Sequence, residues 1–426
     1  MLSPLRRTLR QPINLTRRTQ HLHTFPKRLQ PRRTPTECLH QRRAATSFNA
    51  GASRLFRQHP LQVSLATLAI LLGAAGLVYA NYIYQNYILK AFHKFPEPVA
   101  KKLRRALWYT NQDLQPQEAI KYYRQALQVA EEVGMDPFSD EIMGVKIQVA
   151  ALMEKVQQDG KAAQVLEILK RDSLEWIRQY GSLPHNKAKR TRVLAKCVSI
   201  SVKLGELYGS AAIYNREAAE ERLVWAVETV LKETQRRNSL NIPLDSEEEG
   251  KWMSGDEIGA ALEALAHNYE EKDQHYLATP LFLQALSLYP TKDCHSVILM
   301  NNLASSLAQQ SPRAARAAQA YATSQNIDER PSGPAITRES MIANAQSWAQ
   351  KALDVAAGIQ PPERNEECDA GCAVATHNLG EFAEMLGDKA GARKRYEEAI
   401  SLARAIGFQE GVETSSERLR SLKAGG

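Results

Sequence analysis

The 426-residue sequence predicts an all-α protein in which repeated pairs of helices follow one membrane-spanning helix and a basic, disordered leader. Two observations support this fold class. From residue 100 onward, apolar residues recur at helical spacing, and Gly, Asn, Asp or Pro interrupts them about every fifteen residues. Ahead of this region, residues 58–89 contain no Lys, Arg, Asp or Glu. We therefore divide the chain into a leader (1–57), a membrane segment (58–89), a linker (90–99) and a repeat domain (100–426).

The leader has the composition of a mitochondrial transit peptide. It holds 13 of the 55 Lys and Arg residues and a single acid, Glu37, among many Ser, Thr and Gln residues. A secretory signal would place an apolar core soon after its first charges, and none appears before residue 61. The alternative is a disordered basic arm. Because the other 42 basic residues are outnumbered by 46 acids, the net charge of +8 does not indicate nucleic-acid binding.

The membrane segment contains a dense apolar run from Leu61 to Ala80. Its length of about 20 residues matches the ~30 Å of hydrocarbon that a helix must cross. Tyrosines follow the run, as expected at a membrane interface, and charges resume at Lys90. The alternative is a buried helix of a soluble domain, which would normally carry a polar stripe. A matrix-targeting leader before a stop-transfer helix predicts an inner-membrane protein with its N-terminus in the matrix and its repeats in the intermembrane space.

The repeat domain follows the tetratricopeptide (TPR) pattern. This pattern needs Leu-Gly-x-x-Tyr on a first helix and Ala-x-x-x-aromatic-x-x-Ala on a second, because small residues let the two helices pack closely. Weaker copies surround residues 119–126, 149–169, 204–226 and 303–352. The two best units comprise Leu265, Ala266, Tyr269, Ala278, Phe282, Ala285 and Pro290, and Leu379, Gly380, Ala383, Ala392, Tyr396 and Ala399. The sequence thus predicts a TPR-like α-solenoid of about six helix pairs.

Two insertions interrupt the repeats. Residues 238–254 are acidic and contain Gly250, and residues 311–340 contain several prolines, although Arg313 to Tyr321 can form a helix. Long loops inside a compact repeat are usually functional or disordered. We expect both segments to be loops for most of their length.

The face of each first helix that does not pack on its partner should line an extended groove. This face is rich in glutamates with apolar interruptions, so the sequence predicts an acidic peptide-binding groove. The alternative is that these glutamates form a solvated surface. The predicted groove residues are Glu206, Ala260, Glu263, His267, Glu270, Glu271, His377, Glu381 and Glu384.

The sequence offers little that could support catalysis. There is no Gly-rich phosphate loop, no His-Glu-x-x-His helix and no Gly-x-Ser-x-Gly motif, and the histidines lack metal-ligand spacing. We expect no cofactor and no enzymatic activity. Cys368 and Cys372 lie close together in a polar segment, where two free thiols, a disulfide or, with His377, a metal site are all open.

The order of leader, single span, linker and repeats resembles a known family. The most similar stretches are residues 95–98 (FPEP), 103–109 (LRRALWY), 116–123 (PQEAIKYY) and 377–382 (HNLGEF). Together they resemble the fungal TPR adaptor subunit of the mitochondrial inner-membrane i-AAA protease complex.

This resemblance implies a protein that binds unfolded or misfolded inner-membrane and intermembrane-space proteins and delivers them to the i-AAA protease. The implied partners are the protease hexamer, a second membrane adaptor subunit and client polypeptides. A TPR scaffold or assembly factor for a respiratory-chain or protein-import complex is the alternative, because it would need the same anchor and groove.

Overall fold

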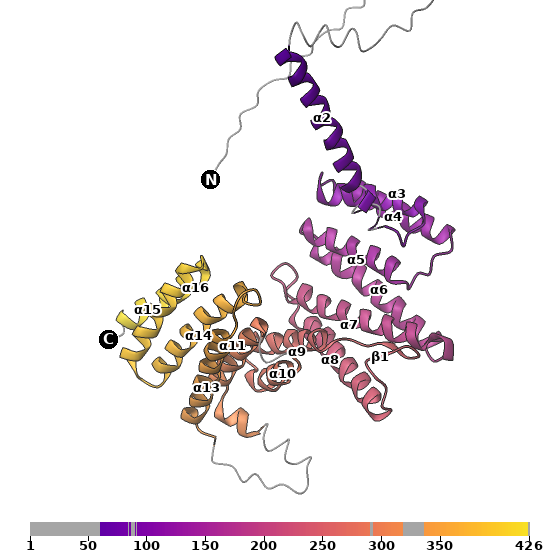
Figure 1. The fold of residues 1–426 in the computed structure, drawn as a ribbon. Helices are drawn as coiled ribbons and strands as arrows, with labels where there is room; N and C mark the ends of the chain where they lie inside the picture. The colour runs from indigo at the N-terminus through magenta and orange to yellow at the C-terminus, as the bar shows by residue number, and fades with distance from the viewer. Residues whose placement is uncertain are drawn as a thin grey trace, which may run out of the picture. The chain divides into compact units, whose positions relative to one another are not determined.

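The computed structural model describes residues 60–83, 85–86, 90, 92–289, 293–317 and 336–424, and most of these residues are helical. They fall into two units, of which the first ends at Asn86 and the second begins at Tyr87 (Figure 1). The predicted leader 1–57 and residues 318–335 of the second insertion lie outside the described residues.

The first unit contains one described helix, α2 (Pro60–Ile83). Its 24 residues have a length of about 36 Å at 1.5 Å per residue, enough to cross the hydrocarbon of a bilayer. Among the described residues, α2 is the one helix that is long and apolar enough to span a membrane. Its leucines are exposed in the isolated chain, including Leu61 and Leu77.

Among its described residues, the second unit contains six pairs of long helices and a final single long helix, α16 (Gln409–Ala424). The two helices of each pair pack against each other along their length. This arrangement confirms the predicted TPR-like α-solenoid. The pairs are α3 (Glu97–Asn111) with α4 (Pro116–Glu132), α5 (Asp140–Lys155) with α6 (Asp159–Tyr180), α7 (Lys187–Gly209) with α8 (Arg216–Ser239), α9 (Gly255–Glu270) with α10 (His275–Leu288), α11 (Cys294–Gln309) with α13 (Arg338–Gly358), and α14 (Glu366–Met385) with α15 (Lys389–Ala405).

Short polar and proline signals set the helix boundaries. Pro116 stands at the start of α4, where its missing N–H costs no helical hydrogen bond. Ser254 caps α9 by accepting a hydrogen bond from the backbone N–H of Glu257, whose carboxylate accepts one from the N–H of Ser254. Positive-φ glycines end α4 and α14 at Gly134 and Gly387.

Close packing of small residues joins the helices of a pair. Gly205 on α7 lies against the side chain of Leu223 on α8, so close that an added Cβ would lie 2.4 Å from Leu223 Cγ. Gly380 on α14 stands in the same position against the ring of Tyr396 on α15. The alanines of the repeat pattern on the second helices, namely Ala219, Ala226, Ala392 and Ala399, are buried beside these contacts. The residues that identify the repeat are therefore the residues that let the helices approach.

The first insertion is irregular for most of its length, and a short hairpin organises it. After α8, residues β1 (Asp245–Ser246) and β2 (Gly250–Lys251) pair as a short antiparallel hairpin, and Trp252 beyond it is buried in the core. The buried guanidinium of Arg237 holds the segment by donating to the carbonyls of Pro243 (3.0 Å) and Gly250 (2.8 Å). The acidic composition of residues 238–254 does not indicate that Arg237, at the end of α8, holds them in place.

One boundary differs from the predicted one, and one short helix agrees with its prediction. The linker 90–99 belongs to the repeat unit, because Phe92 and Phe95 pack against the first part of the core and α3 already begins at Glu97. In the second insertion, residues 312–317 are helical, which agrees with the start of the helix expected from Arg313 onward.

The Gly205 contact leads to a test of the repeat packing. We expect Gly205→Ala to destabilise the repeat domain by about 1–3 kcal/mol, because the new methyl group must displace Leu223 or move α8 away. The matched control is Gly144→Ala in the middle of α5, where no atom lies within 4 Å of the new Cβ. That change should stabilise the helix by ~0.5–1 kcal/mol. Urea unfolding of the detergent-solubilised full chain measures the change in stability of each variant. Equal unfolding midpoints for the two variants would contradict the packing argument.

Candidate peptide-binding groove

A pocket of about 470 Å³ lies between the first helices of the third and fourth pairs, α7 and α9. Leu223 of α8, the partner helix of α7, also lines the pocket. Five predicted groove residues meet in this pocket: Glu206 from α7, and Ala260, Glu263, His267 and Glu271 from α9 or its C-terminal end. The pocket also includes residues that the sequence analysis did not select, namely Gly205, Gly209, Ser210, Ala264 and Asn268. Their positions next to the predicted residues along the same two helices could have identified them.

Glu263 is the centre of a network of charged side chains in this pocket. Its carboxylate lies 2.9 Å from Nε2 of His295 on α11 and 3.5 Å from Nε2 of His267. Burial alone would raise the pKa of Glu263, but the hydrogen bonds with the two histidines outweigh it and lower the pKa to about 2. Glu263 is therefore ionised and already paired.

His267 is correspondingly held in its cationic form. Burial opposes the charge, yet hydrogen bonding to Glu263 and to Glu270 (3.2 Å) raises the pKa of His267 to about 9. Its ring also packs edge-on against Phe282, with ring centroids 5.2 Å apart. Glu270 thus supports His267 and does not line the pocket. The pocket is less acidic than its glutamates suggest, because the His267 cation offsets part of the charge and His295 hydrogen-bonds the Glu263 carboxylate.

Two glutamates of the pocket are more available to a ligand. The Glu206 side chain is exposed and forms an ion pair with Lys203 on the surface of α7, at 3.1 Å. Glu271 is exposed at the end of α9, and its side chain has no ion-pair partner among the described residues. Exposed pairs of this kind are weak, so a basic ligand can compete for Glu206.

The predicted groove residues of the sixth pair, His377, Glu381 and Glu384, are partly exposed and contact the final helix α16. His377 lines a separate pocket of about 210 Å³ together with residues of α16. The final helix α16 packs beside α14, and Arg418 of α16 lies 3.4 Å from the carboxylate of Glu381 and 3.3 Å from that of Glu384. His377 lies 2.9 Å from Ser415 Oγ of the same helix. The repeat pattern does not indicate these contacts, because α16 follows the last repeat and has no repeat pattern of its own.

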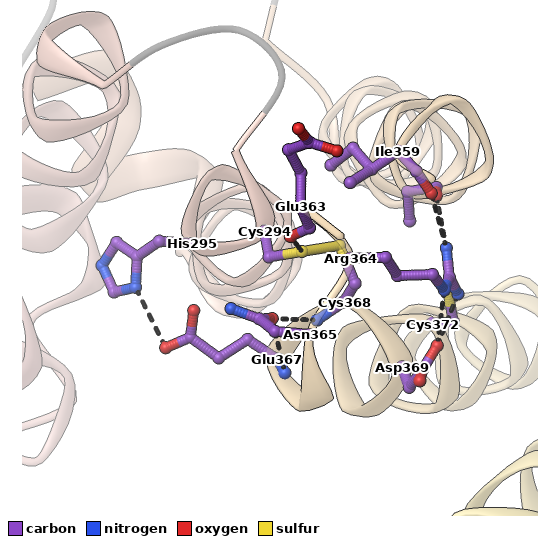
Figure 2. The surroundings of a disulfide bond; sticks show 11 residues. Cys294, His295, Ile359, Glu363, Arg364, Asn365, Glu367, Cys368, Asp369 and Cys372 are labelled. Atoms are coloured by element: carbon purple, nitrogen blue, oxygen red, sulfur yellow. Dashed lines mark hydrogen bonds and ion pairs between the residues drawn. A yellow bond between two sulfur atoms is a disulfide. The ribbon is translucent and has the colours of Figure 1, made fainter. Parts of the chain in front are cut away.

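The cysteine pairing also corrects the sequence analysis. Cys368 is bonded to Cys294 of α11, 74 residues earlier, and Cys372 is a free thiol (Figure 2). Cys368 and Cys372 lie one turn apart on α14, where Cβ atoms are ~5–6 Å apart, too far for a disulfide that needs ~3.5–4.5 Å. Instead, the Cys372 sulfur lies 3.9 Å from Nη2 of Arg364, whose guanidinium is paired with Asp369.

A separate pocket, of about 500 Å³, lies between α3 and α5. Phe92 and Phe95 of the predicted linker form part of its wall together with Leu103 and Leu107. Nothing in the repeat pattern marks these two phenylalanines, because they precede the first repeat. Over the described residues, no cluster of His, Cys, Asp and Glu is arranged to hold a metal ion.

The helix pairs define the class of fold: it is a TPR-like α-solenoid, whose stacked repeats create extended surfaces. Comparison with curated proteins agrees with this fold. The chain is similar to a TPR repeat-containing protein of Schizosaccharomyces pombe, with 29% identity over 364 residues that cover 84% of this chain and 85% of the relative.

Comparison with protein-family models gives no match. Among solved structures, the chain is similar to the C-terminal part of a TPR repeat-containing protein from Cytophaga hutchinsonii, with 14% identity, a TM-score of 0.40, and coverage of 76% of this chain and 94% of that one. It is also similar to BtubC from P. vanneervenii, with 13% identity, a TM-score of 0.39, and coverage of 73% and 91%.

The charge network predicts a pH dependence of stability. The contribution of His267 is complete below its unfolded pKa of about 6.5 and is lost as the pH rises through about 9. The contribution of Glu263 is present above about pH 4.5 and is lost as the pH falls towards 2. Since 46% of the His267 side chain is exposed, solvent screening keeps the effect small. We expect His267→Gln to lower the thermal midpoint by about 1–3 °C at pH 6 and by less at pH 9.5.

The control for this measurement is His185→Gln, which removes an exposed histidine from the short 3-10 helix η2 (Pro184–Asn186). It should leave the midpoint unchanged at both pH values. If His267→Gln lowered the midpoint equally at pH 6 and pH 9.5, the loss would come from packing against Phe282 and not from the charge.

Proposed function

We propose that this protein is a membrane-anchored TPR adaptor that binds unfolded or misfolded proteins of the mitochondrial inner membrane and intermembrane space. It delivers them to the i-AAA protease for degradation. The observation that carries the binding part of this proposal is the pocket between α7 and α9, where exposed carboxylates stand beside apolar side chains. The delivery part rests on the resemblance of the linker and first repeats to the fungal adaptor subunit.

The pocket suits an extended segment that has basic and apolar residues. Val202, Leu223, Ala260 and Ala264 provide apolar contact area, and Glu206 and Glu271 provide negative charge at its exposed side. Unfolded chains expose such segments, whereas folded proteins bury their apolar residues. No enzymatic activity is part of this proposal, and no cofactor is needed for it.

The disulfide supports a location outside the matrix and the cytosol. Cys294 and Cys368 are both buried, and their bond closes a long loop that contains the second insertion. Disulfides persist mainly in oxidising compartments. We propose that α2 spans the inner membrane with the N-terminus in the matrix, so that the repeat unit lies in the intermembrane space.

The partners in this proposal are the i-AAA protease hexamer, a second membrane adaptor subunit and client polypeptides. A scaffold or assembly factor for a respiratory-chain or import complex would use the same anchor and groove. Co-purification from solubilised mitochondria separates the two functions. AAA protease subunits would support the adaptor, and respiratory or translocase subunits without the protease would support the scaffold.

The groove glutamates provide the first test of binding. Replacing Glu206 and Glu271 together with Gln should weaken binding of a capped peptide that carries Lys and Leu residues, by roughly 2–10-fold at low salt. The difference should shrink as salt rises, because the Debye length falls from ~10 Å at 0.1 M to ~3 Å at 1 M. Fluorescence anisotropy with the detergent-solubilised full chain measures both effects.

The matched control is the double replacement of Glu397 and Glu398 with Gln on α15, where both carboxylates pair with exposed arginines. Glu263, Glu270, Glu381 and Glu384 are poor choices, because their carboxylates hold His267 or Arg418 and their loss would change stability. Equal binding by wild type and the Glu206 and Glu271 variant at low salt would show that the two carboxylates form only a solvated surface.

The disulfide provides a test of the compartment. When native protein is denatured without reductant and labelled with a maleimide of high mass, Cys294 and Cys368 should stay unlabelled. Reduction before labelling should add two labels to wild type and none to the double variant Cys294→Ser, Cys368→Ser. If reduction added no label to wild type taken from mitochondria, the bond would be absent there and the compartment proposal would lose its support.

A further inference from the structure

A second, positively charged pocket lies on the same two helices as the acidic pocket. It has a volume of about 330 Å³ and is lined in part by Arg192, Lys196, Ser199, Lys251, Trp252 and Met253. Lys251, Trp252 and Met253 come from the first insertion, which was expected to be a loop. The folded hairpin therefore adds a wall to the groove that the repeats alone would not provide.

Three cations, Arg192, Lys196 and Lys251, and two acids line this pocket. Asp140 lies 3.1 Å from Nη1 of Arg192, and the Glu257 carboxylate accepts a hydrogen bond from the neutral backbone N–H of Ser254 at 2.8 Å, so the cations outnumber the acids by one. Lys196 has no ion-pair partner in the part of the chain that the structure describes. Lys251 is exposed, and its carboxylate neighbour Asp245 lies 3.9 Å away. The two lysines leave a positive charge facing the pocket.

The two pockets lie at opposite ends of parallel helices. The positive pocket is lined by residues 192–199 of α7 and by Glu257 near the start of α9, whereas the acidic pocket is lined by residues 202–210 of α7 and residues 260–271. Lys196 and Glu206 are ten residues apart on α7, which corresponds to about 15 Å along the helix. An extended chain covers that distance in four to five residues, at ~3.3 Å per residue.

We propose that the groove between α7 and α9 recognises extended segments that carry a carboxylate and a basic residue four to five positions apart. The carboxylate binds beside Lys196 and Lys251, and the basic residue binds beside Glu206 and Glu271. Apolar residues between them contact Val202 and Ala260. This inference rests on the proposed function of the groove in peptide binding and adds the charge pattern that a client segment must have.

The test measures the affinity of four peptides for the detergent-solubilised full chain by fluorescence anisotropy. All four peptides share the same apolar residues, and the first three are capped at both ends. The first peptide has Glu and Lys five positions apart, the second has them adjacent, and the third has Lys in place of Glu. A fourth peptide has no Glu but a free C-terminal carboxylate at the same distance from Lys, which separates a terminal carboxylate from a side-chain one. We expect the first peptide to bind roughly 2–5-fold tighter than the second and third, which corresponds to one added ion pair.

A charge exchange at Lys196 makes the test specific. Lys196→Glu should weaken binding of the first peptide and strengthen binding of the third, because the new carboxylate attracts the added Lys. The control is Lys161→Glu, an exposed residue of α6 that lines neither pocket and should change neither affinity.

Three results would decide against the inference in different ways. Equal affinity for the first and second peptides would overturn the required spacing while leaving peptide binding intact. A Lys196→Glu variant that loses affinity for the first and third peptides alike would overturn the role of Lys196 as the carboxylate partner. Failure of all four peptides to bind would overturn the proposed binding function together with this inference.

Discussion

The structure depends on how closely the two helices of each pair approach. Where Gly205 meets Leu223 and Gly380 meets Tyr396, the absence of a Cβ on one helix leaves room for a large side chain on the other. Buried alanines at the neighbouring positions continue this contact along each pair. Because both helices of a pair use one face for this packing, the opposite face of each first helix is left for neighbouring repeats and for the groove.

The side chains on that remaining face are largely committed to one another. Glu263 links His267 on its own helix with His295 on the next first helix, so the network ties α9 to α11 as it neutralises the groove. At the C-terminal end, Arg418 of α16 satisfies Glu381 and Glu384 and covers the last repeat with a polar helix. Terminal repeats need such a polar cover because no further repeat packs against them. We therefore place the proposed peptide binding between α7 and α9.

The two insertions affect the solenoid differently. The first is held by buried Arg237 and contributes Lys251 and Trp252 to the wall of the groove. The second separates α11 from α13, and the disulfide between Cys294 and Cys368 bridges α11 and α14 across it. Cross-linking the ends of a long loop reduces the conformational entropy of the unfolded chain, by an amount that corresponds to ~4 kcal/mol for loops of this size. The disulfide thus stabilises the part of the solenoid that the second insertion would otherwise weaken.

The sequence alone determined the repeat architecture, because the TPR pattern consists of the small and large residues that make the helix contacts themselves. It also placed Glu206, Ala260, Glu263, His267 and Glu271 on one surface, since residues at helical spacing share a face. Only the tertiary structure decided which of the predicted carboxylates are free, because His295, the partner of Glu263, and Arg418, the partner of Glu381 and Glu384, lie on other helices. For the same reason, the partner of Cys368 and the place of the hairpin in the groove depended on contacts between residues far apart in the chain.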